Sequence, residues 1–124
     1  MKHLKNIKDI EETITKYHLC LFYIKAPDCG VCNVMLDKVE RLADDFPALC
    51  SFYTDISEEP LIAGRFLVYS GPTALLLMDG KEVWRGSQFI DLEELLYNIF
   101  SSLRYREPEV QSVERSLSQC YLPL

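Results

Sequence analysis

The spacing of hydrophobic positions changes repeatedly along the chain, and each spacing predicts an element. Apolar residues on one helical face predict a first helix: Ile7, Ile10, Ile14 and Tyr17. Asn6 is a suitable N-cap for this helix. The next run, 19–25, is too short and too continuously apolar for a surface helix, and it predicts a central strand covered on both faces.

The rest of the chain continues to alternate. A second helix is predicted by Val31, Met35, Val39, Leu42 and Phe46, and it ends before Pro47. Strands are predicted at 48–53, 73–78 and 81–85, the last two joined by an Asp79-Gly80 hairpin turn. A short helix follows the acidic 58–60 segment to about residue 66, and Asp91 caps a final amphipathic helix through residue 103. The predicted order is α-β-α-β-α-β-β-α, with residues 1–4 as a further edge strand.

Composition narrows the class of protein. The 124 residues suffice for one domain, and 48% hydrophobic residues indicate a globular chain. A net charge of −6 argues against non-specific binding to nucleic acid or anionic membranes. The chain has no apolar run long enough to span a bilayer, and its first residues lack a signal-peptide core. We therefore expect a cytoplasmic protein in a reducing compartment.

The strongest candidate for chemistry is Cys29-Gly30-Val31-Cys32, between the central strand and the second helix. Unpaired N–H groups and the partial positive charge at a helix N-terminus stabilise a thiolate at the first cysteine. The second thiol is close enough to attack a mixed disulfide formed by the first. A single CxxC pair is nevertheless compatible with either redox chemistry or metal binding.

The remaining cysteines do not suggest a metal site. Cys20 and Cys50 lie in strand-like apolar runs and are expected to be core residues, whereas Cys120 is either incidental or a redox or partner thiol. A zinc site needs four ligands in a recognisable spacing, and the chain has no second pair and only isolated histidines. We expect no metal, and a zinc site or a bridging iron–sulfur cluster is the disfavoured alternative.

Three motifs in this order resemble the thioredoxin family. They are Ala26-Pro27-Asp28-Cys29-Gly30-Val31-Cys32, Gly71-Pro72-Thr73, and the hairpin Leu75-Leu76-Leu77-Met78-Asp79-Gly80. The resemblance covers residues 1–103 and implies an α/β thioredoxin fold with a central mixed sheet of four to five strands flanked by helices. Residues 104–124 lie outside it as a C-terminal extension.

The resemblance also implies a substrate groove beside the cysteines. Pro72 corresponds to the cis-proline of the family, and Gly30, Val31, Gly71 and Thr73 accompany it in the groove. Gly71 stands where the family more often has a branched residue, which is expected to open the groove. Trp84 is interpreted as a core residue, with the far wall of the groove as the alternative.

The chain departs from the family at positions expected to tune the thiols. Tyr23 occupies the place of a buried aspartate that handles the proton of the resolving thiol, and Tyr53 occupies the place of its lysine partner. Asp28 replaces the tryptophan before the first cysteine, and its carboxylate disfavours a Cys29 thiolate. Lys25 is expected to offset part of the negative charge of Asp28. A cysteine with a pKa near that of an ordinary thiol is expected.

The implied function is thiol–disulfide exchange with protein disulfides, with Cys29 as nucleophile and Cys32 as resolving thiol. A flavin-dependent reductase is the implied electron donor, and no bound cofactor is expected. The alternative is a thioredoxin-fold binding or redox-sensing module without efficient reductase activity.

The C-terminal extension has a helical pattern of its own, with Val110, Val113 and Leu117 on one face. Such a short helix must dock on another surface to be stable. Its own domain is one docking surface, and a second copy of the chain or another protein is the alternative. A disordered tail is the remaining interpretation. The expected oligomeric state is a monomer or a weak homodimer formed through this segment.

Overall fold

The computed structural model describes residues 1–105, and the predicted C-terminal helix therefore lies outside the described residues. The strands are β1 (Lys2–His3), β2 (Leu19–Lys25), β3 (Cys50–Asp55), β4 (Thr73–Met78) and β5 (Lys81–Ser87). The helices are α1 (Ile7–Lys16), α2 (Gly30–Ala43), α3 (Leu61–Phe66) and α4 (Leu92–Arg104). The predicted element order, including the edge strand, is confirmed.

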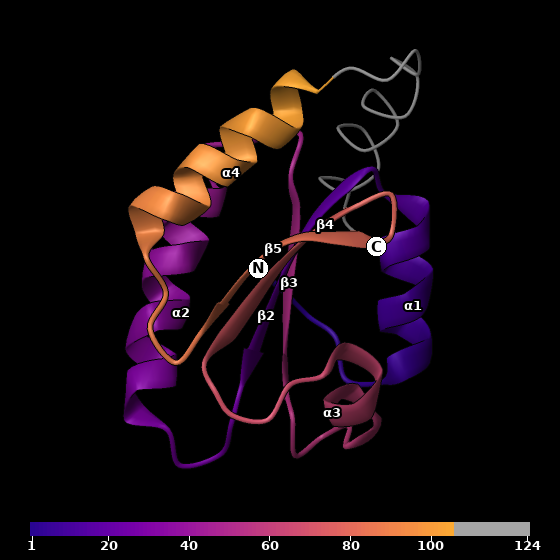
Figure 1. The fold of residues 1–124 in the computed structure, drawn as a ribbon. Helices are drawn as coiled ribbons and strands as arrows, with labels where there is room; N and C mark the ends of the chain where they lie inside the picture. The colour runs from indigo at the N-terminus through magenta and orange to yellow at the C-terminus, as the bar shows by residue number, and fades with distance from the viewer. Residues whose placement is uncertain (106–124) are drawn as a thin grey trace.

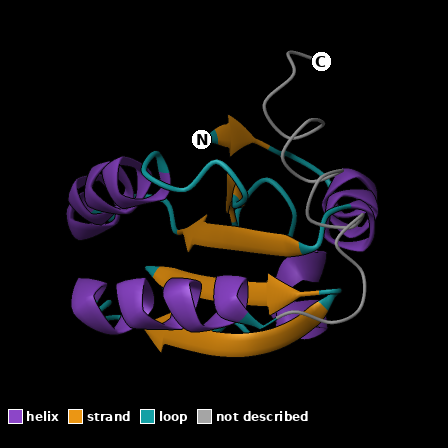
Figure 2. Ribbon diagram, turned by 90° about the horizontal axis from the view of Figure 1, so that it is seen from above, coloured by secondary structure: helices purple, strands orange, loops and turns teal. Residues whose placement is uncertain are grey.

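The five strands form one mixed sheet in the order β1-β3-β2-β4-β5. β2 pairs parallel with β3 and antiparallel with β4, and β4 continues antiparallel into β5. Helices lie to either side of the strands, with α1 and α3 on one side and α2 and α4 on the other (Figures 1 and 2). This arrangement confirms the predicted α/β fold.

Each face of the sheet has its own hydrophobic core. Tyr17, Phe22, Phe52 and Phe66 belong to the core on the α1 and α3 side. Leu21, Tyr23, Val39 and Trp84 belong to the core on the α2 and α4 side. Because side chains alternate along a strand, β2 contributes to both cores, and every one of its residues except Lys25 is buried. The central strand is thus a rigid support for the segment that follows it.

Cys20, Cys50 and Trp84 are buried, which confirms their interpretation as core residues. The Trp84 indole N–H donates a hydrogen bond of 2.6 Å to Glu94 Oε1, so its polar edge is satisfied. Cys20 on β2 and Cys50 on β3 are direct partners in the register of these two strands.

Local residues fix the starts of two helices and the turn of the hairpin. Asn6 and Asp91 cap α1 and α4 by accepting backbone N–H groups of the first turn. The Asp79-Gly80 hairpin is present, with both residues at positive φ, 52° and 80°. Among residues 1–105, no helix is long and apolar enough to cross a membrane.

Several predicted boundaries were wrong. β3 ends at Asp55 and β5 at Ser87, each two residues later than predicted. α2 ends at Ala43 and not just before Pro47, because the Phe46 N–H bonds to the Ala43 carbonyl in a turn while its ring still packs in the core. β3 begins at Cys50, two residues later than predicted, since Leu49 N–H is bonded to Phe46 in the preceding turn.

Candidate active site

The cysteine pair lies where β2 ends and α2 begins, at the lower end of the molecule in Figure 1. Cys29 and Cys32 are joined by a disulfide, and their Cα atoms are 5.2 Å apart. Cys29 is the N-cap residue of α2, and its sulfur accepts a hydrogen bond of 3.2 Å from the Cys32 N–H. The sulfur atom of Cys29 therefore occupies the position that a serine or aspartate oxygen takes in other helices.

The two cysteines differ in exposure. Cys29 is partly exposed, whereas Cys32 is fully buried one turn into the helix. Gly30 and Val31 between them are exposed, and 57% of the Val31 surface is accessible. A disulfide substrate can reach the first sulfur directly and the second only through the first.

Tyr23 lies beneath the cysteine pair, on the central strand. It is fully buried, and its hydroxyl donates a hydrogen bond of 2.7 Å to the backbone carbonyl of Cys32. Burial raises the pKa of the Tyr23 hydroxyl well above its ordinary value, because the phenolate would lose its solvation. Tyr23 is therefore a neutral donor that holds the backbone of Cys32, and it cannot accept a proton as a carboxylate would.

Tyr53 is the partner of Tyr23 in the β2–β3 register, so the two side chains lie on the same face of the sheet. The His3 ring stacks on Tyr53, with ring centroids 4.5 Å apart. The Lys25 ammonium lies 5.8 Å from the centroid of the same ring. An aromatic layer thus occupies the region where the family resemblance implies a carboxylate and a lysine.

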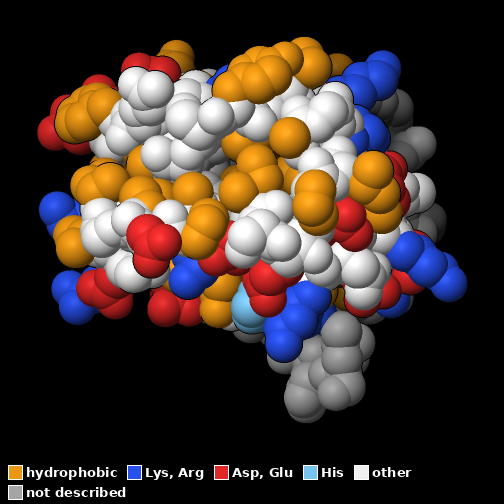
Figure 3. All heavy atoms as spheres, turned by 90° about the horizontal axis from the view of Figure 1, so that it is seen from below, with side chains coloured by type: hydrophobic (Ala, Val, Ile, Leu, Met, Phe, Trp, Pro, Cys, Tyr) orange, Lys and Arg blue, Asp and Glu red, His pale blue; other side chains and the backbone are white. Residues whose placement is uncertain are grey.

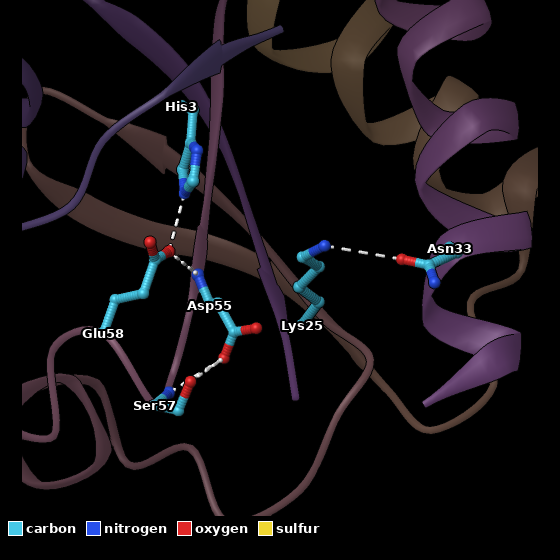
Figure 4. A network of polar contacts seen from close by, with 6 residues as sticks. All are labelled: His3, Lys25, Asn33, Asp55, Ser57 and Glu58. Carbon is cyan, nitrogen blue, oxygen red and sulfur yellow. Dashed lines mark hydrogen bonds and ion pairs between the residues drawn. The ribbon is translucent and has the colours of Figure 1, made fainter. Parts of the chain in front are cut away.

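Lys25 is directed toward Asn33. Its Nζ donates to Asn33 Oδ1 over 3.4 Å, on α2 (Figure 4). The Lys25 charge also acts on Asp55. Partial burial would raise the pKa of the Asp55 carboxyl, but hydrogen bonds from Ser57 and the nearby positive charges outweigh burial, so the pKa of Asp55 is lowered. No direct ion pair between Lys25 and Asp28 is present among residues 1–105, so the expected offset of the Asp28 charge does not come from contact.

The loop before β4 closes over the buried cysteine. The Gly71–Pro72 peptide bond is cis, in agreement with the resemblance. A Cβ atom at Gly71 would lie 3.2 Å from the Cys32 sulfur and 3.0 Å from the Ala26 nitrogen. The space beside this glycine is filled by Ala26 and Cys32, so the glycine permits close packing and does not open the groove as expected.

The predicted groove residues differ in what a substrate could touch. Gly30, Val31 and Gly71 are at least partly accessible, whereas Pro72 is buried. The Thr73 side chain is 1% exposed, and its hydroxyl donates to the Ser70 carbonyl. The Thr73 side chain therefore faces inward and holds the loop, and its assignment to the groove stays a prediction.

Sequence reasoning missed two exposed aromatic residues beside this loop, Tyr69 and Phe89. The Gln88 N–H donates to the Pro72 carbonyl over 2.7 Å, which brings the segment before α4 against the cis-proline loop. Both aromatic residues lie between predicted elements, where single hydrophobic residues carry no periodic signal.

Comparison with known proteins agrees with the geometry. A thioredoxin-like protein of Bacillus subtilis, YdfQ, is 30% identical over 109 residues, which cover 88% of this chain and 97% of the relative. The chain belongs to the thioredoxin family. A thioredoxin of Chlamydia trachomatis is 35% identical over 68 residues, covering 55% of this chain and 67% of that protein. No protein-family model matches the chain.

Thioredoxin structures share the fold over most of the chain. A mutant thioredoxin from Halobacterium salinarum superposes with a TM-score of 0.76 at 22% identity, covering 86% of this chain and 93% of that one. The family and the closely spaced cysteine pair support thiol–disulfide oxidoreduction as the general chemistry of this site. Among residues 1–105, no group of three or more His, Cys, Asp or Glu side chains could hold a metal ion.

Proposed function

We propose that this chain exchanges its Cys29–Cys32 dithiol and disulfide with disulfides of protein substrates. The observation that carries the proposal is the difference in exposure across one turn of α2: Cys29 is partly exposed and Cys32 is fully buried. This asymmetry supports the assignment of Cys29 as the nucleophile and Cys32 as the resolving thiol.

The reaction proceeds in two exchanges. The Cys29 thiolate attacks one sulfur of the substrate disulfide, and the other substrate sulfur leaves as a thiolate that takes up a proton. Cys32 then loses its proton and attacks the Cys29 sulfur, which releases the second substrate thiol and closes the protein disulfide. Two electrons pass from the protein dithiol to the substrate. The N-terminus of α2 favours the Cys29 thiolate, since a sulfur at this position accepts a backbone N–H.

Regeneration of the dithiol requires an external reductant, for which a flavin-dependent reductase is the proposed donor. The reducing, cytoplasmic setting remains part of this proposal, as does the monomer or weak homodimer formed through residues 104–124.

The alternative is a thioredoxin-fold module that binds a partner or senses oxidation without efficient turnover. One observation favours it: the residue beneath Cys32 is Tyr23, whose raised pKa removes an internal proton acceptor for the resolving step. A slow second exchange is compatible with a sensor that stays oxidised for long periods.

A reductase-coupled assay with a protein disulfide as substrate separates the two functions. We expect turnover by the full-length protein, loss of turnover in Cys29→Ser, and accumulation of a covalent mixed disulfide in Cys32→Ser. Cys120→Ser is the matched control, because it removes a thiol outside the motif. Turnover that survives both Cys29→Ser and Cys32→Ser would reject the oxidoreductase proposal in favour of the binding module.

A further inference from the structure

Two large aromatic side chains with little cover lie on the segments that flank the cis-proline loop. Tyr69 is 84% exposed and Phe89 is 77% exposed, in a chain whose other large side chains are mostly packed in two cores. Figure 3 views this end of the molecule, where hydrophobic side chains are scattered across the face and charged side chains gather below its centre and at its edges. Exposed aromatic surface of this kind is typical of a recognition site.

Backbone contacts place both residues on segments that meet at the cis-proline loop, which packs against the Cys32 sulfur. Tyr69 lies two residues before Gly71, whose Cβ position is 3.2 Å from the Cys32 sulfur. Phe89 follows Gln88, which bonds through its N–H to the Pro72 carbonyl and through its side chain to the Ser70 hydroxyl, over 3.3 Å. The two aromatic residues therefore belong to neighbouring segments joined across the cis-proline loop.

Asp28 adds a negative charge beside the cysteine pair. It is exposed, directly precedes Cys29 and has a left-handed backbone conformation with φ of 56°. It forms no ion pair within residues 1–105, and the nearby Lys25 is engaged with Asn33 and Tyr53 instead (Figure 4). Its charge is thus available to a bound substrate.

We propose that the surface formed by Asp28, Tyr69 and Phe89 selects one class of disulfide: cystines in an extended protein segment that carries a basic residue and a large apolar residue beside the cysteine. This inference rests on the proposed oxidoreductase function and adds its substrate class. The basic residue pairs with Asp28, and the apolar residue covers the aromatic side chains. Small anionic disulfides such as glutathione disulfide are disfavoured, because they repel Asp28 and leave the aromatic surface exposed.

The size of the preference follows from the exposure of the charges. Two opposite charges about 4 Å apart in water attract strongly enough to raise an association constant about fivefold, and salt reduces the effect. Reversing the charge of the substrate turns this attraction into a repulsion of similar size. The two effects multiply, so we expect the full-length protein to prefer a basic over an acidic peptide by about 25-fold at low salt, and by less as salt screens the charges.

The test uses four synthetic peptides, each with one intramolecular cystine flanked by Lys and Phe, Glu and Phe, Lys and Gly, or Glu and Gly. Reduced full-length protein is mixed with each peptide disulfide, and the rate of protein oxidation is followed by acid quench and mass spectrometry. Each reaction yields one protein disulfide and one peptide dithiol. We expect the Lys–Phe peptide to react fastest and the Glu–Gly peptide slowest.

Variants separate the two halves of the surface. Asp28→Asn is expected to abolish the Lys-over-Glu preference, whereas Tyr69→Ser and Phe89→Ser are expected to reduce only the Phe-over-Gly preference. Asp28→Asn also changes the Cys29 environment, but a change in thiol pKa alters the rates with all four peptides equally and leaves their ratios unchanged. Matched controls are Asp45→Asn, an exposed carboxylate beyond the far end of α2, and Tyr97→Ser, an exposed aromatic residue on α4.

The outcomes distinguish the proposed substrate preference from the proposed oxidoreductase function on which it rests. Equal rates with all four peptides would overturn the substrate preference while leaving thiol–disulfide exchange intact. A preference that survives in Asp28→Asn and in the aromatic variants would place the selectivity elsewhere and also overturn it. Failure of every peptide to oxidise the protein would reject the oxidoreductase function itself, and the substrate class with it.

Discussion

Replacing Tyr23 with phenylalanine removes a single oxygen atom from the centre of the molecule. The ring and its packing are retained, while the 2.7 Å hydrogen bond to the Cys32 carbonyl is lost. The net contribution of a buried hydrogen bond is about 1 kcal/mol. We expect Tyr23→Phe to lower the free energy of unfolding by about this amount at pH 7 to 9.

The difference between the two proteins should then vanish at alkaline pH. Burial raises the pKa of Tyr23 in the folded protein, whereas an unfolded tyrosine titrates near pH 10. The stabilisation from a neutral, buried Tyr23 is complete below that pH. It is lost as the pH rises above it, by about 1.4 kcal/mol for each pH unit. Phenylalanine has no proton to lose, so the variant becomes the more stable protein about one unit above pH 10.

Urea unfolding of the oxidised proteins from pH 8 to 11, followed by fluorescence of the single tryptophan, Trp84, measures this difference. The other tyrosines are common to both proteins and cancel in the comparison. Tyr97→Phe is the control, because that residue is 70% exposed and should show no pH-dependent difference. A difference between wild type and Tyr23→Phe that stays constant through pH 11 would refute the account of Tyr23 as a hydroxyl that resists ionisation.

Three further predictions concern stability. Gly71→Ala places a methyl group 3.2 Å from the Cys32 sulfur and should lower the free energy of unfolding by about 1–3 kcal/mol in urea titrations; an unchanged value would mean that the loop yields without cost. Asp91→Ala removes the N-cap of α4 and should cost about 1 kcal/mol in thermal unfolding, while Asp91→Asn should retain most of that stability. Arg85→Met removes donors to the Phe66 and Leu67 carbonyls at the end of α3, so amide exchange should increase in α3 and not in α4.

Much of the fold could be predicted because local patterns and the fold agree. The continuous apolar run at 19–24 is buried in the centre of the sheet, and the capping residues Asn6 and Asp91 lie where the sequence indicates. The end of α2 was misplaced because Phe46 keeps the helical period in sequence but packs from a turn. Periodicity reports which side chains are buried, and it does not report where backbone hydrogen bonding changes.

The candidate site was only partly predictable. The proposed roles of Cys29 and Cys32 follow from their position at a helix start, and the cis bond at Pro72 follows from the family resemblance. The partners of these residues come from distant parts of the chain. Gly71 is required because Ala26 and Cys32 approach it in space, a contact that no local pattern encodes.

The sequence by itself determined the order of the elements, the central strand, the reactive pair and the absence of an aspartate beneath it. These properties depend on residue type and on spacing along a few turns of chain. Only the tertiary structure decided what Tyr23 does in place of that aspartate: its neutral hydroxyl is bonded to the Cys32 carbonyl. It also decided that Tyr69 and Phe89 border the same loop, since segments far apart in sequence meet there through backbone hydrogen bonds.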